Sequence, residues 1–306
     1  MNKKFTLLLS IIISSILVFS GCSKAKEKSD LLQVTTTTTM LKDLVDVIAK
    51  DKVETINLMG PGIDPHLYKA SAGDVRKLQE ADIIVYNGIH LEGKMSDLFD
   101  SLYKIDKNVI SIEDAIDTSE LLMTEDNVWD PHIWFSVRLW KKAAVHVSNE
   151  LSKYDPENKD FYSENLNSYL KELDDLDLYV KNSIKEIPDN QKYLITAHDA
   201  FAYYGHDYGV EVVGIQGIST QSEAATSDIK RLSNLIVDKK IKAIFIETSV
   251  PTKTIESLRD SVRSKGFDVS IGGELFSDSL GDKESGADTY IKMVKKNTDT
   301  LKNSLK

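Results

Sequence analysis

The sequence is poor in cysteine and in basic residues, and both shortages exclude classes of protein. With one cysteine, Cys22, among 306 residues, no disulfide can form within the chain. Asp and Glu number 48 against 38 Lys and Arg, which gives a formal net charge of −10. Nucleic acids and anionic lipid surfaces attract clustered Lys and Arg, so this balance argues against either as an electrostatic partner.

Long apolar runs are scarce as well. The run over residues 5–19 follows Lys3 and Lys4, and it is too short for a comfortable membrane span. It ends in VFSGC, where small residues precede Cys22. The segment resembles a bacterial lipoprotein signal, except that Phe19 stands where such signals usually carry an aliphatic residue. The alternative is an ordinary secretory signal with an incidental cysteine.

This N-terminal pattern predicts a signal peptide over residues 1–21 and a lipid-modified Cys22. The polar and charged residues that follow have no apolar periodicity, so we expect residues 22–32 to form a flexible tether. With the only cysteine used as the anchor, a metal site in this chain would consist of His, carboxylate and carbonyl ligands without thiolate.

The remainder alternates between strand-like and helix-like segments. A hydrophobic content of 41 % and a charged content of 28 % are typical of a soluble globular protein that can form buried apolar cores. Strands that alternate with helices predict an α/β fold with parallel sheets and right-handed crossovers. The threonine run 35–39 is predicted to continue a strand, because threonine favours β structure. Ser71 and Asp74 have the spacing of a capping box before a helix.

One long helix is predicted over residues 155–188, with an α/β lobe over 33–154 before it and a second over 189–306 after it. Asp155 can cap this helix, Pro156 suits its first turn, and Pro188 lies just beyond its end. Apolar residues recur every three or four positions along it and predict one buried stripe. The stripe consists of Leu166, Tyr169, Leu173, Leu176, Val180, Ile184 and Ile187.

The tripeptide Asp-Pro-His occurs twice, and we refer to Asp64–Pro65–His66 and Asp130–Pro131–His132 as the first and second DPH motifs. Proline fixes its own φ angle and pushes the preceding residue into an extended conformation, so the histidine is presented on stiff backbone. The aspartate is predicted to accept a hydrogen bond from an imidazole or a loop amide. The duplication favours a metal site over two structural histidines.

Further candidate ligands follow predicted strands of the second lobe. Open α/β sheets bind ligands beyond the carboxyl ends of their strands. His198 lies at the end of the strand KYLITAH, and Asp278 follows the strand FDVSIGG. The remaining histidines, His90, His146 and His206, have no ligand-like setting and are interpreted as structural.

Six motifs then occur in a characteristic order along nearly the whole mature chain: GPGIDPHLYKASAGDV, WDPHIWFS, TAHDAFAYYGHDYG, GIST, IFIETSVPTKTI and GGELFSDSLG. They resemble the metal-binding lipoproteins of bacterial manganese and zinc ABC transporters. The resemblance implies two Rossmann-like α/β lobes joined by one long rigid backbone helix, with a metal site in the cleft between the lobes.

Carried over position by position, the resemblance makes His66 and His132 the ligands from the first lobe, and His198 and Asp278 those from the second. The implied cargo is Mn²⁺ or, alternatively, Zn²⁺. Members dedicated to zinc often have a long histidine-rich loop before the second DPH motif, and the corresponding segment here contains no histidine. Carboxylate ligation also suits Mn²⁺, so the sequence favours manganese.

The resemblance implies a non-enzymatic solute-binding protein, held by Cys22 at the extracytoplasmic face of the cell membrane. It would act as a monomer that delivers metal to an ABC permease and its ATPase. A metallohydrolase is the main alternative, in which Glu223 or Glu247 would serve as general base beside the metal. A surface adhesin is a further alternative.

Overall fold

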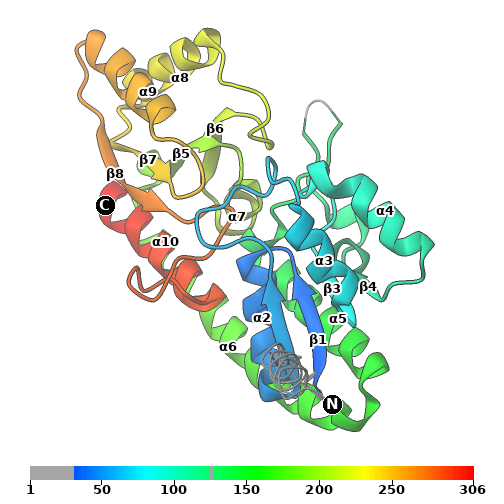
Figure 1. Ribbon diagram of the computed structural model, residues 1–306. Coiled ribbons are helices and arrows are strands. Elements are labelled where there is room, and N and C mark those ends of the chain that lie inside the picture. Colours follow the sequence, from blue (N-terminus) through cyan, green and yellow to red (C-terminus); the bar gives the residue numbers. More distant parts are fainter. Residues whose placement is uncertain (1–30, 125–126) are drawn as a thin grey trace, which may run out of the picture. The chain divides into compact units, whose positions relative to one another are not determined.

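The computed structural model describes residues 31–124 and 127–306. The predicted signal peptide, Cys22 and nearly all of the predicted tether therefore lie outside the described residues. Residues 32–306 form one compact unit in which strands alternate with helices, as predicted for an α/β protein (Figure 1). No helix within the described ranges is long and apolar enough to cross a membrane.

The first half of this unit contains a four-stranded parallel sheet with the strand order β2-β1-β3-β4. Its strands are β1 (Leu32–Thr36), β2 (Val53–Asn57), β3 (Ile83–Tyr86) and β4 (Val109–Ser111). The helices of this half are α2 (Thr39–Ala49), α3 (Ala72–Glu80), α4 (Ser96–Lys104) and α5 (Val137–Tyr154).

The threonine run departs from its prediction. The strand β1 ends at Thr36, and Thr39 is already the first residue of α2. The side chain of Thr38 accepts a hydrogen bond from the amide of Leu41 and so caps the helix. Threonine hydroxyls compete for backbone donors in this way, which lets the same residue type end a strand and begin a helix.

The capping box predicted for α3 is confirmed. The hydroxyl of Ser71 accepts from the amide of Asp74, and the carboxylate of Asp74 accepts from the amide of Ser71. Both contacts satisfy amides that the first turn of the helix leaves without partners. The start of α3 is thereby fixed shortly after the first DPH motif.

The long helix is α6 (Lys159–Lys185), whose 27 residues span about 40 Å. It begins later than predicted, because residues Pro156–Asn158 form a separate 3₁₀ turn. The carboxylate of Asp155 makes no backbone cap and instead accepts from the hydroxyl of Tyr162 at 2.5 Å. The predicted apolar stripe is confirmed, since all seven of its side chains are buried.

The second half contains two pairs of parallel strands, β5 with β6 and β7 with β8, and β5 lies against β7. The strands are β5 (Tyr193–His198), β6 (Glu211–Gln216), β7 (Ala243–Glu247) and β8 (Ser270–Leu275). The helices are α7 (Ala202–Tyr208), α8 (Thr226–Lys239), α9 (Lys253–Ser264) and α10 (Tyr290–Leu305).

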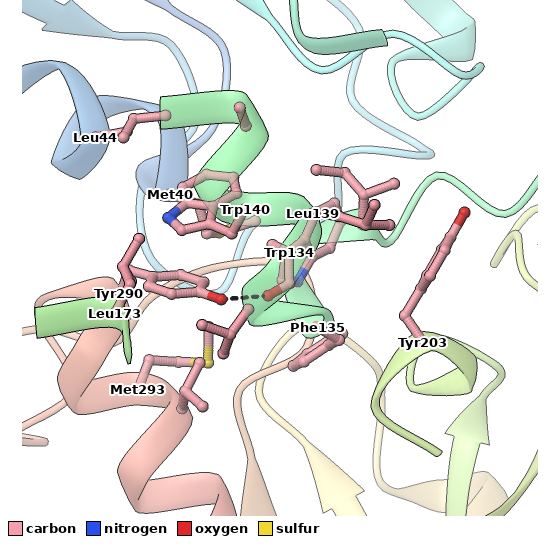
Figure 2. Close-up of a cluster of buried hydrophobic side chains, with 14 of the residues drawn as sticks. Met40, Leu44, Trp134, Phe135, Leu139, Trp140, Leu173, Tyr203, Tyr290 and Met293 are labelled. Atoms are coloured by element: carbon pink, nitrogen blue, oxygen red, sulfur yellow. Dashed lines mark hydrogen bonds between the residues drawn. The ribbon is translucent and has the colours of Figure 1, made fainter. Parts of the chain in front are cut away.

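The helix α6 packs against α2 and α5 from the first half and against α10 from the second. One continuous apolar core therefore includes side chains from both halves. Figure 2 shows part of it, where Trp140 stacks on Tyr290 with ring centroids 4.8 Å apart. The hydroxyl of Tyr290 donates to the carbonyl of Trp134 at 2.7 Å. Because Trp134 follows His132 by two residues, this core also fixes the second DPH motif.

Candidate metal centre

The first DPH motif lies in the loop between β2 and α3. Oδ1 of Asp64 accepts hydrogen bonds from the backbone amides of His66 at 2.8 Å and Leu67 at 3.3 Å. This bears out the prediction that the aspartate of the motif can accept from a loop amide. The contacts fold the tripeptide into a tight turn that presents His66, whose side chain is buried.

The second DPH motif leads into a 3₁₀ turn at Ile133–Phe135. Oδ1 of Asp130 accepts from the amide of His132 at 2.9 Å and lies 2.6 Å from Nδ1 of the same imidazole. Here the prediction of an aspartate–imidazole contact is confirmed. A carboxylate at Nδ1 holds the proton on that nitrogen, which leaves the lone pair of Nε2 free to bind a cation.

His198, the last residue of β5, has a carboxylate partner that sequence reasoning assigned to a different role. Nδ1 of His198 lies 2.6 Å from Oε2 of Glu247, and the amide of His198 donates to Oε1 at 3.0 Å. Glu247 is the last residue of β7, next to β5. The position of Glu247 at a strand end was a partial signal, because the carboxyl ends of adjacent parallel strands meet at one edge, but the sequence did not show that β5 and β7 are adjacent.

The four predicted ligands come together. One atom from each of His66, His132, His198 and Asp278 can be chosen so that all lie within 4.8 Å of one another. Nε2 of His66 and Nε2 of His132 are 3.3 Å apart. Oδ1 of Asp278 lies 3.3 Å from Nε2 of His198 and 3.6 Å from Nε2 of His132. None of the four side chains is more than 2 % exposed.

Of the other histidines in the described ranges, His90, His146 and His206 do not belong to this cluster. The two candidate bases of a hydrolase are not free beside it either. Glu247 contacts His198 directly, and Glu223 is exposed on the segment between β6 and α8. The cluster therefore has the composition of a metal site enclosed by protein ligands.

Burial and charge set the protonation of the cluster. Burial lowers the pKa of His66 to about 3, which keeps this imidazole neutral. Burial also lowers the pKa of His198, but the carboxylates of Glu247 and Asp278 outweigh it and hold that pKa well above 6.5. Burial opposes the charge of Asp278, yet His198 and the other imidazoles keep its pKa below the usual range. A bound divalent cation would replace the proton between His198 and Asp278.

Comparisons with known proteins find a family and relatives that match nearly the whole described chain. The family described as zinc-uptake complex component A, periplasmic, matches residues 34–304. The manganese-binding lipoprotein MntA of Bacillus subtilis is 39 % identical over 98 % of this chain and 99 % of its own length. The zinc-binding protein TroA of Treponema pallidum is 44 % identical over 88 % of this chain and 87 % of its own length.

The solved structure of the periplasmic zinc-binding protein TroA from Treponema pallidum superposes with a TM-score of 0.88 and covers 90 % of this chain and 99 % of that one. The fold, the cluster and these relatives define a metal-binding substrate-binding protein of an ABC transporter, which is not an enzyme. The chain belongs to the family described as zinc-uptake complex component A, periplasmic. The predicted class and two-lobed α/β fold are confirmed.

Proposed function

We propose that this protein captures a divalent transition metal, with Mn²⁺ preferred, and delivers it to an ABC permease driven by its ATPase. His66, His132, His198 and Asp278 are the proposed ligands. One observation carries the proposal: three imidazole nitrogens and one carboxylate oxygen converge within 4.8 Å in a buried site. Such a set of nitrogen and oxygen atoms concentrates negative potential that a divalent cation would neutralise.

Both the proposed ligand atoms and the relatives support Mn²⁺ as the preferred metal. The set contains no thiolate, and a second oxygen of Asp278 can raise the coordination number above four, which suits Mn²⁺. MntA of Bacillus subtilis, similar over nearly its whole length, is named for manganese. The second candidate is Zn²⁺, for which TroA is named. Intrinsic affinity favours Zn²⁺ at almost any such site, so a preference for Mn²⁺ would depend on geometry and metal supply.

We further propose how the chain is divided and where it is held. Residues 33–154 and 189–306 act as the two lobes, residues 155–188 connect them, and metal bridges them through ligands from both. Residues 1–21 direct export, and a lipid on Cys22 with the tether 22–32 holds a monomer at the extracytoplasmic face of the membrane. One acyl chain anchors a protein only marginally, so a Cys22 anchor requires more than one chain.

The test is calorimetric titration of Mn²⁺ into chelator-stripped protein that begins after Cys22, repeated with Zn²⁺ as competitor. We expect one saturable Mn²⁺ site that His66→Ala abolishes and Zn²⁺ blocks. A site that accepts only Zn²⁺ would transfer the assignment to zinc uptake. Absence of binding by either metal would refute the proposal.

A further inference from the structure

The two DPH motifs use the same residue types for different contacts. In the second motif, the carboxylate of Asp130 bonds to the imidazole of its own histidine. In the first motif, Oδ1 of Asp64 serves the local amides, and Oδ2 accepts from the hydroxyl of Thr220 at 2.5 Å. Thr220 belongs to the second half of the molecule. The first motif is therefore bonded across the site, whereas the second motif orients its own ring.

The residues around the two motifs also differ in burial: those after the second motif are buried in the core, and those beside the first are partly exposed. The residues after His132, from Ile133 to Phe135, are all buried in the core that joins the halves. The indole of Trp134 also donates to the carbonyl of Ser277 at 2.9 Å. The first motif is flanked by Ile63 and Leu67, whose side chains are 40 % and 48 % exposed. Apolar burial holds the second motif in place and contributes much less to the first.

Polar contacts from the second half hold the first motif instead. Besides Thr220, the hydroxyl of Ser279 accepts from the amide of Gly62 at 2.8 Å. The side chain of Gln221 donates to the carbonyl of His66 at 3.5 Å, which is at the long limit for a hydrogen bond. The bond from Thr220 to a carboxylate is the strongest type among these contacts.

The imidazole of His66 is also the least supported of the three. Nδ1 of His132 and Nδ1 of His198 each lie 2.6 Å from a carboxylate oxygen. Within residues 31–124 and 127–306, no hydrogen-bond partner faces Nδ1 of His66. Of the three rings, the one in His66 can therefore leave the site with the fewest contacts broken.

We propose that Thr220 is a positioning residue that latches the first DPH motif across the site, and that metal release begins when its bond to Asp64 breaks and His66 departs first. The inference rests on the proposed function, because it concerns the dissociation of the cargo metal. It gives a role to Thr220, the last residue of the Gly-Ile-Ser-Thr stretch at 217–220, which supplies no ligand to the cluster.

We refer to the hydrogen bond between Thr220 and Asp64 as the latch. It forms only when the two sides of the site have met, so its loss is expected to raise the rate of metal dissociation and to leave the rate of association unchanged. A hydrogen bond to a charged acceptor has the strength to change a rate constant about tenfold. We therefore expect Thr220→Val to raise the Mn²⁺ release rate about tenfold and to leave the association rate nearly unchanged. Thr220→Ser retains the hydroxyl and is expected to restore slow release.

Release is measured by mixing Mn²⁺-loaded protein with excess chelator and following tryptophan fluorescence by stopped flow. The matched control is Thr226→Val, since Thr226 is exposed and has no side-chain partner in the part of the chain that the structure describes. Hydrogen exchange of the loaded protein provides a second readout. In Thr220→Val the amides of His66 and Leu67 are expected to exchange faster, while the amide of His132 stays protected.

The outcomes separate the latch from the function on which it depends. Unchanged release in Thr220→Val, or an equal rise in Thr226→Val, overturns the latch while metal binding by the wild-type protein stands. Faster exchange at His66 and His132 alike would reveal general loosening and would also overturn it. If the wild-type protein binds no metal, the proposed function fails and the latch fails with it.

Discussion

Nδ1 of His198 lies 2.6 Å from Oε2 of Glu247, so a buried imidazole of the candidate metal centre is paired with a buried carboxylate outside the four-residue cluster. The pair holds the ring in place, with Nε2 of His198 3.3 Å from Oδ1 of Asp278. The same relationship links Asp130 to His132. Two of the three imidazoles are thus oriented by carboxylates that do not belong to the four proposed ligands.

Glu247→Gln is expected to weaken Mn²⁺ binding about 10- to 100-fold, because residues that orient metal ligands typically have effects of this size. The amide retains an acceptor for one contact but removes the charge that favours the proton on Nδ1. Competitive titration against a chelator of known affinity measures the change. The matched control is Glu223→Gln, an exposed glutamate that lies outside the four-residue cluster. Equal effects of the two substitutions would contradict the assigned role.

Metal affinity is expected to fall as the pH is lowered, with release of about one proton per bound ion near neutral pH. Two carboxylates hold the pKa of His198 well above 6.5, so this ring carries a proton that the metal must displace. Burial lowers the pKa of His66 to about 3, so this ring is already neutral near pH 7 and releases no proton when metal binds. Calorimetry in buffers of different ionisation enthalpy counts the protons. Binding enthalpies independent of the buffer would refute the expectation.

Asp43→Asn is expected to raise the stability of the protein at alkaline pH. Burial raises the pKa of Asp43 to about 6 from 3.8, so the folded state binds the proton more tightly than the unfolded state does. The resulting stability is present below pH 3.8 and is lost as the pH rises through about 6. An asparagine can still accept from the amide of Tyr290, which Asp43 does at 2.8 Å.

Each pKa unit corresponds to about 1.4 kcal/mol, so the gain is expected to be about 3 kcal/mol at pH 8 and to vanish as the pH falls below 3.8. Urea unfolding of both proteins across this range measures the difference in unfolding free energy. A difference that stays constant with pH would show that Asp43 titrates alike in the folded and unfolded states.

Leu173→Ala is expected to reduce the free energy of unfolding by about 2–5 kcal/mol, because the cavity it leaves in the core cannot fully collapse. Leu173 lies on the buried stripe of α6 and is 0 % exposed. Leu178 on the same helix is 57 % exposed, so Leu178→Ala is expected to change stability by about 0.5 kcal/mol or less. Comparable losses from both substitutions in chemical denaturation would contradict the packing described for this helix.

Sequence patterns predicted the features that depend on short spacings. The apolar stripe of α6 and the capping box at Ser71 and Asp74 follow from helical periodicity and local hydrogen bonding. The end of β1 at Thr36 was not predicted, because threonine suits both a strand and a helix cap. Periodicity also left the separate 3₁₀ turn before α6 undetected.

Sequence motifs singled out the four proposed ligands, whose side chains the structure brings together, but they did not predict most of the contacts that hold those side chains in place. The duplicated DPH motif and the strand ends pointed to His66, His132 and His198 before any contact was known. The contact between Glu247 and His198 joins residues 49 positions apart, and the bond between Thr220 and Asp64 joins residues 156 positions apart. Contacts over such distances depend on how the strands and loops assemble, which local sequence does not specify.

The core that runs along α6 into both halves has a thermodynamic consequence. Side chains on either side of the site belong to one apolar cluster, so the halves are expected to melt together. A cation held between them then stabilises the entire fold by an amount that grows with the logarithm of its free concentration. The melting temperature, measured by a probe at any position in residues 32–306, would therefore report metal occupancy, even when no probe is attached to the site itself.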